Sequence, residues 1–231
     1  MISKTVLHRF FLTCLVCLQF LSIQVAASQL PHERVQKATD ALLKEIPAAK
    51  VYFEKDPERF YDVVDDTLSP VIDFYSFTRS VMGPFGKRAY YASLDKAQRA
   101  QFKLDYSEFV ETFKLGLIRT YAKGLLVFDG QNIVITPPTE EELALIEQGK
   151  SITVVQTINA TTDVYILRYK MSPNKKGEWV LKNVVMESIN VGQLYQNQFL
   201  SSMKKYNNDF SAVIKHWLSE TKEADFKAKA E

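Results

Sequence analysis

The first half of the chain carries apolar side chains at helical spacing. Valine, alanine and leucine recur every three or four residues over residues 31–46, and Pro47 is expected to end that helix. Residues 56–58, Asp-Pro-Glu, predict the start of a second helix, because proline fits a first turn and acids favour a helix N-terminus. A short helix is expected over residues 73–83, closed by a Gly-Pro stop signal.

The longest predicted helix opens after Ser93, a residue type suited to cap a helix N-terminus, and ends near Gly124. Its aromatic and leucine side chains recur at steps of three or four and form one continuous stripe: Phe102, Tyr106, Phe109, Phe113, Leu117 and Tyr121. Such a stripe indicates a helix that buries one whole face.

The second half of the chain changes to the period of β-strands. Residues 140–148 are polar and fit either a solvated turn or a short helix, and residues 174–177 fit a hairpin turn. Strand-like runs occupy residues 132–136, 151–160, 163–171 and 178–189, and helical patterns return over 193–205 and 210–218. We therefore predict an α+β fold in which a bent antiparallel sheet of about four strands packs against several helices.

The N-terminus has the layout of a secretory signal peptide. Lys4 and Arg9 precede an apolar run that ends at Val25-Ala26-Ala27, and that run is shorter than a membrane-spanning helix needs. Cleavage after Ala27 leaves one predicted domain over residues 28–231, with 231 − 27 = 204 residues, its meander sheet within 132–190. Both cysteines, Cys14 and Cys17, and two positive charges leave with the signal, so the formal charge falls from +2 to 0. No excess of basic residues then points to nucleic acid.

The predicted mature chain is poor in catalytic groups. It keeps two histidines, His32 and His216, and we interpret both as surface residues. Nucleophile elbows, phosphate-binding glycine loops and metal-ligand spacings are absent from the sequence. The acid clusters at residues 65–66 and 140–142 are interpreted as solvated faces. We therefore predict that the protein is not an enzyme and holds no metal or cofactor.

Aromatic residues make up 12% of the chain, with 15 Phe and 11 Tyr. One interpretation is a large aromatic core. The other is an apolar cavity between the sheet and the long helix, which an acyl chain would complete, since pockets for apolar ligands have walls of this composition. The pattern alone does not separate the two, because both require an inward stripe.

Three segments resemble the toluene-tolerance (Ttg2) or MlaC family of periplasmic phospholipid-binding proteins. Residues 72–83 resemble its "DF…R.V.G" element, and residues 94–121 its "T.EQR..F…F…L..TY" helix. Residues 177–199 resemble "G.W.V.DV.VEGVS…NYR.QF", with Ser188 and Asn197 replacing the family's Gly and Arg. Pro84 to Arg88 replace the family's aromatic-basic pair. The matches follow in order along the whole predicted mature chain.

The resemblance implies a monomeric periplasmic carrier whose cargo is a glycerophospholipid, with its acyl chains buried between the sheet and the helices. Such proteins move lipid between an outer-membrane lipoprotein complex and an inner-membrane ABC transporter that carries an MCE-domain protein, and so serve outer-membrane lipid asymmetry. Their role is binding, and the transporter uses the ATP.

Candidate cavity residues follow from the helical stripe and the strand alternation. The helices contribute Val81, Met82, Phe109, Phe113, Leu117, Tyr121, Tyr195 and Phe199, and the sheet contributes Val154, Tyr165, Leu167, Tyr169, Val184 and Met186. Arg79 and Arg119 are candidate phosphate or partner contacts, because arginine suits phosphate geometry, and a structural ion pair is the alternative for each.

Two other functions are compatible with the sequence. A periplasmic adaptor or interaction module would have the same fold with a filled core and no cargo. A lipase or other hydrolase would release lysolipid from phospholipid.

Overall fold

The computed structural model describes residues 29–160 and 163–228, with side chains described up to residue 219. The predicted signal peptide lies outside these residues. Helices occupy α2 (Pro31–Tyr52), α3 (Pro57–Leu68), α4 (Phe74–Val81), the 3₁₀ turn η1 (Gly83–Gly86), α5 (Arg88–Ser93), α6 (Lys96–Leu125), α7 (Glu140–Glu147), α8 (Val191–Lys205) and α9 (Phe210–Ala228).

Helix α2 continues beyond the point where the sequence predicted its end. Pro47 lies inside the helix, which ends at Tyr52, so that boundary was wrong. The turn after the proline is held by tertiary contacts: Ala49 is fully buried, and Lys50 Nζ donates to the Phe128 carbonyl oxygen at 2.6 Å. These contacts offset the hydrogen bond that a proline cannot donate.

The start of the long helix was also predicted at the wrong residue. Asp95, and not Ser93, caps α6: its carboxylate accepts from the Gln98 amide at 2.8 Å, while the Gln98 side chain accepts from the Asp95 amide at 2.9 Å. This reciprocal capping box satisfies two helix-terminal donors. Ser93 instead ends α5, a short helix that the sequence pattern did not reveal, and its hydroxyl donates to the Tyr90 carbonyl.

The strands form one antiparallel sheet in the order β1-β2-β3-β4-β5, which confirms the predicted α+β class. They are β1 (Asn132–Ile135), β2 (Ile152–Asn159), β3 (Val164–Pro173), β4 (Trp179–Met186) and β5 (Ile189–Asn190). The pairing of β3 with β4 shifts between Lys170 and Met171, an irregularity that bends a strand.

The last strand-like run is split into β4 and β5, so the sheet has a fifth, two-residue strand. Glu187 adopts a left-handed φ of 54° between them. Its amide donates to the Ile166 carbonyl at 2.9 Å, and its carboxylate accepts from the Ile166 amide. These two bonds hold a turn that alternation of apolar residues does not indicate.

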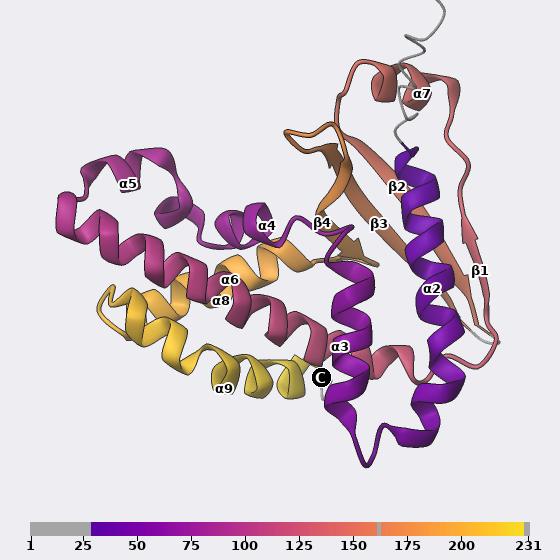
Figure 1. Ribbon diagram of the computed structural model, residues 1–231, viewed down its shortest axis with the longest axis horizontal. Coiled ribbons are helices and arrows are strands. Elements are labelled where there is room, and N and C mark those ends of the chain that lie inside the picture. The colour runs from indigo at the N-terminus through magenta and orange to yellow at the C-terminus, as the bar shows by residue number, and fades with distance from the viewer. Residues whose placement is uncertain (1–28, 161–162, 229–231) are drawn as a thin grey trace, which may run out of the picture.

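The helices form two groups around the sheet (Figure 1). Helix α2 lies across one face of β1–β3, and α3 runs beside it, whereas α4, α5, α6, α8 and α9 gather beyond the β4 edge. Buried side chains form three clusters. One cluster joins α4, α6, α8 and α9, a second joins α2, α3 and the C-terminal part of α6, and a third joins α2 to the sheet.

Candidate functional site

The face of the sheet turned toward α2, called here the inner face, is apolar. Strand register places three rows of side chains on it: Val154 with Tyr169 and Val184, Gln156 with Leu167 and Met186, and Ile158 with Tyr165. All six sheet residues predicted from alternation therefore share one face. Ile133, Ile135, Gln156 and Ile158 belong to the same face and were not among the candidates, although the same alternation places them there.

Exposure changes along this inner face. At one end, Val154 and Met171 are completely buried and pack with Val35 of α2. At the other end, Leu167, Met186 and Ile158 are only half-buried. Tyr165 is 45% exposed. The half of the inner face around Leu167, called here the open half, is thus apolar without being fully covered.

The long helix does not cover the open half. Helix α6 packs against α3, α4 and α9, whereas the sheet receives its main helical contacts from α2, α4, α7 and α8. Of the two interpretations of the stripe, the packed aromatic core is the one that agrees with its burial against α4, α8 and α9. A helix can bury a full aromatic stripe against other helices and leave a neighbouring sheet face without a partner.

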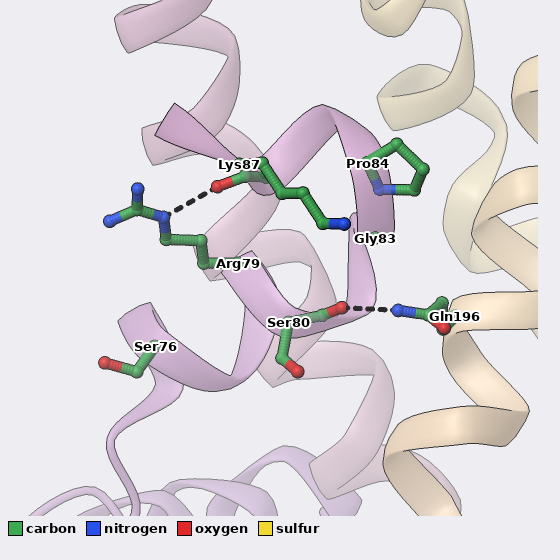
Figure 2. Close-up of a pocket in the computed structure, with 8 residues that line it drawn as sticks. Ser76, Arg79, Ser80, Gly83, Pro84, Lys87 and Gln196 are labelled. Atoms are coloured by element: carbon green, nitrogen blue, oxygen red, sulfur yellow. Dashed lines mark hydrogen bonds between the residues drawn. The ribbon is translucent and has the colours of Figure 1, made fainter. Parts of the chain in front are cut away.

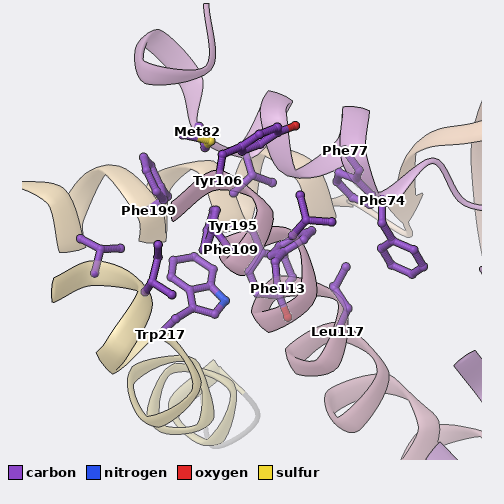
Figure 3. Close-up of a cluster of buried hydrophobic side chains, with 14 of the residues drawn as sticks. Phe74, Phe77, Met82, Tyr106, Phe109, Phe113, Leu117, Tyr195, Phe199 and Trp217 are labelled. Atoms are coloured by element: carbon purple, nitrogen blue, oxygen red, sulfur yellow. The ribbon is translucent and has the colours of Figure 1, made fainter. Parts of the chain in front are cut away.

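The aromatic stripe instead forms the packed cluster of the helical layer (Figure 3). The Phe109 and Trp217 rings lie edge to face with centroids 5.0 Å apart, and the Phe113 and Tyr195 rings do the same at 5.3 Å. The cluster holds most of the helical candidates in buried positions, with Tyr121 half-buried at its margin: Val81, Met82, Phe109, Phe113, Leu117, Tyr195 and Phe199. Val184 of β4 packs against the same cluster. The lining role of these helical residues stays a prediction.

A buried polar chain crosses the inner face at the limit of the open half. The Tyr169 hydroxyl donates to Gln156 Oε1, and Gln156 Nε2 donates to the Thr39 hydroxyl of α2 at 3.2 Å. Gln156 is 4% exposed. Burial raises the pKa of the Tyr169 hydroxyl, which is therefore a neutral donor at physiological pH.

Arg79 lies in a cleft of about 490 Å³ between α4, η1 and α8 (Figure 2). Its Nε donates to the Gly86 carbonyl oxygen at 2.7 Å. On the other side of the cleft, Gln196 Nε2 of α8 donates to the Ser80 carbonyl oxygen of α4 at 2.9 Å. Lys87 also lines this cleft. The cleft lies on the α4–α8 side of the molecule and not on the inner face of the sheet, so Arg79 is separated from the sheet candidates.

Arg119 forms a structural ion pair, which was the alternative to a phosphate or partner contact. Its Nη2 lies 2.9 and 2.8 Å from the two carboxylate oxygens of Glu58, and its guanidinium lies over the Tyr61 ring. This pair ties α6 to the start of α3. Its predicted role in phosphate or partner contact stays untested.

His32 is not the surface residue that the sequence suggested, because it is only 7% exposed. Burial lowers the pKa of His32, and this effect outweighs the nearby Glu142 carboxylate, which raises the pKa. The neutral form therefore predominates at neutral pH. His216 is half-buried and stacks on Tyr206 with ring centroids 5.1 Å apart. Both histidines thus have structural surroundings that sequence position alone does not reveal.

Residues 29–160 and 163–228 also bear on metal binding and on membrane insertion. No group of three His, Cys, Asp or Glu side chains there could hold a metal ion. No helix in that part of the chain is both long and apolar enough to cross a bilayer.

Comparison with known proteins identifies the family. The model of the MlaC protein family matches residues 36–219. The chain belongs to the MlaC family. The toluene tolerance protein ttg2D of Pseudomonas putida is 30% identical to it over 221 residues, which cover 95% of this chain and 93% of the relative. The resemblance deduced from three sequence segments is thereby confirmed.

The fold is also found in a solved structure. A phospholipid-binding protein from Ralstonia solanacearum, determined in complex with a phospholipid, superposes with a TM-score of 0.65. The match covers 86% of this MlaC-family chain and 98% of the other, at 20% sequence identity. At that identity the match shows a common fold, which supports the predicted helix-and-sheet architecture.

Proposed function

We propose that this MlaC-family protein is a periplasmic carrier that binds a glycerophospholipid on the open half of the inner face. The observation that carries the proposal is the half-buried apolar surface around Leu167, which α6 leaves without a partner. Two findings support it: the chain belongs to the MlaC family, and a protein of the same fold was determined with a phospholipid.

The energetics of lipid transfer explain the need for such a surface. Burial of each methylene contributes ~0.8 kcal/mol, so a diacyl lipid rarely leaves a membrane unless a protein shelters its chains. An uncovered apolar strip provides that shelter without the cost of displacing packed side chains. Release then requires a membrane complex that offers the lipid comparable apolar surroundings.

The lining is proposed to come mainly from the sheet. Leu167, Met186 and Tyr165 provide its centre, with Val184 at the boundary of the helical cluster. Ile158 and Ile133 extend it toward the β1 edge. The buried stripe residues Phe109 and Phe113 are proposed to belong to the scaffold beside this wall, because their rings are already packed against other rings.

The carrier is proposed to act without catalysis. The phospholipid is cargo, and the proposed partners are an outer-membrane lipoprotein complex and an inner-membrane ABC transporter with an MCE-domain protein. The predicted signal peptide over residues 1–27 supports a periplasmic location. Transfer between the two membranes would serve outer-membrane lipid asymmetry.

The test is lipid retention by Leu167→Glu, which places a carboxylate at the centre of the open half. We expect native mass spectrometry to detect phospholipid bound to wild-type protein exported to the periplasm of a Gram-negative host. The bound fraction of the variant should be at least about tenfold lower, because burying a charge is costly. Thr153→Glu is the matched control, since Thr153 is exposed on the opposite face of the sheet.

Each alternative function has its own readout in the same experiment. Wild-type protein that carries no phospholipid after periplasmic export would support the adaptor without cargo. Lysolipid formed when the pure protein is incubated with phospholipid would support a hydrolase. A folded Leu167→Glu variant with undiminished lipid would remove Leu167 from the binding face.

A further inference from the structure

The inner face of the sheet is divided by a polar boundary. On one side of Gln156, the side chains of Val154, Ile152 and Met171 are at most 5% exposed and pack against α2. Leu167, which pairs with Gln156 in the same row, and Ile158, one row further along, are half-buried. The change occurs within two residues of β2, at the row that holds Gln156.

The boundary consists of three hydrogen-bonded side chains, Thr39, Gln156 and Tyr169, called here the polar bridge. It begins on α2, crosses to β2 and continues to β3, so it spans the space between the helix and the sheet. Gln156 is buried among apolar neighbours, and its cross-strand partners are Ile135 and Leu167. Its amide is therefore satisfied within the bridge.

An acyl chain that advanced past this row would have to separate the bridge. Methylene groups offer no hydrogen bonds, so the Gln156 amide and the Tyr169 hydroxyl would be left buried and unpaired, which is unfavourable. Beyond the bridge, the chain would also meet Val154 and Met171, both completely buried. Entry is thus opposed first by the polar groups and then by close packing.

We infer that the polar bridge is the closed end of the acyl compartment and sets the longest acyl chain that the protein accommodates. This inference rests on the proposed phospholipid binding and adds a determinant of acyl length to it. Tyr169 is the larger barrier, because it has the largest side chain of the bridge and lies between Val154 and Val184 in the next row. Gln156 and Thr39 hold the Tyr169 hydroxyl in place from the α2 side.

The experiment loads lipid-free protein with a mixture of phosphatidylglycerols that differ only in acyl length and reads the bound species by native mass spectrometry. Tyr169→Ala is expected to shift the longest bound species upward. Two residues of a strand span about 6.6 Å, equal to roughly five methylene groups of an extended chain, and this is the expected shift. Gln156→Ala is expected to shift it in the same direction by less, since the Tyr169 ring remains.

Tyr165→Ala is the matched control, because Tyr165 lies on the same strand and the same face but at the exposed end. It is expected to change occupancy without moving the length limit. Folded Tyr169→Ala and Gln156→Ala variants that bind the wild-type range of lengths would overturn the inference and leave lipid binding intact. If the larger changes prevent folding, Thr39→Val, which removes one hydroxyl of the bridge, is tested for the same shift in acyl length.

The two proposals fail in different ways. Wild-type protein that takes up none of these phospholipids refutes the proposed function, and the length determinant with it. Wild-type protein that binds all lengths equally, with no upper limit, refutes the length determinant alone.

Discussion

The aromatic cluster of the helical layer and the inner face of the sheet differ in how completely their apolar side chains are covered. Phe109, Phe113 and Phe199 are fully buried and touch other rings. Leu167 and Met186 are as apolar, yet they are only partly buried. The difference indicates that the aromatic stripe builds the packed scaffold, while the less conspicuous strand residues remain for the proposed binding face.

One of the polar contacts that join the two regions is an ion pair. Lys182 of β4 binds the Asp73 carboxylate, which also accepts from the Ser76 amide and hydroxyl at 2.9 and 2.6 Å at the start of α4. The joint thus fixes the helical layer to the sheet at the register of Lys170 and Met171.

The largest expected effect is on the helical side of this comparison. Phe113→Ala should lower the free energy of unfolding of the lipid-free protein by about 3–5 kcal/mol, because it leaves a cavity between packed rings. Urea denaturation measures the change. Leu104→Ala, at a 66% exposed position of the same helix, should stay within about 0.5 kcal/mol of wild type. Equal losses for the two would mean that the cluster is not close-packed.

The joint between the two regions should have an intermediate effect. Lys182→Met leaves the half-buried Asp73 carboxylate without its cation and should cost about 1–3 kcal/mol at neutral pH. Thermal or urea unfolding measures it, and Lys170→Met, at an exposed position of β3, is the control. A loss no larger than that of the control would mean that the joint contributes little.

The same joint predicts a pH dependence. Burial raises the pKa of Asp73, but hydrogen bonds from Lys182 and Ser76 outweigh it and hold the pKa below its ordinary 3.8. A lowered carboxyl pKa stabilises the fold above the ordinary value, and that stability is lost as the pH falls through the folded pKa. Asp73→Asn should therefore flatten the decline of stability below about pH 4. An unchanged decline would place the acid sensitivity elsewhere.

The smallest effect is expected on the open half. Leu167→Ala should cost about 1 kcal/mol in the lipid-free protein, because few packed neighbours lose contact. Leu181→Ala, at a 6% exposed position that packs on α2, should cost about 2–5 kcal/mol. With phospholipid bound, the loss of unfolding free energy caused by Leu167→Ala should become closer to the loss caused by Leu181→Ala. Equal costs without lipid would show that the open half is already filled.

The hydrophobic pattern by itself determined the fold class, the meander and most element positions. Strand alternation fixes which side of a sheet a residue faces, so Leu167, Tyr169 and Met186 could be grouped before their partners were known. The Asp56 cap and the turn at residues 174–177 depend on neighbours in the chain, and both were predictable for that reason. The family followed from motifs spread over the same segments.

Tertiary structure alone decided which partner each apolar face meets. Pro47 stays within a helix because distant residues secure the next turn, and His32 is buried where Glu142 of α7 comes near it. The α6 stripe turns to α8 and α9, which come about a hundred residues later in the chain. The helical period predicts that a helix has a buried face. It does not predict which element packs against that face, because the hydrophobic effect is non-directional. The open half and its polar bridge arise from that choice of partner.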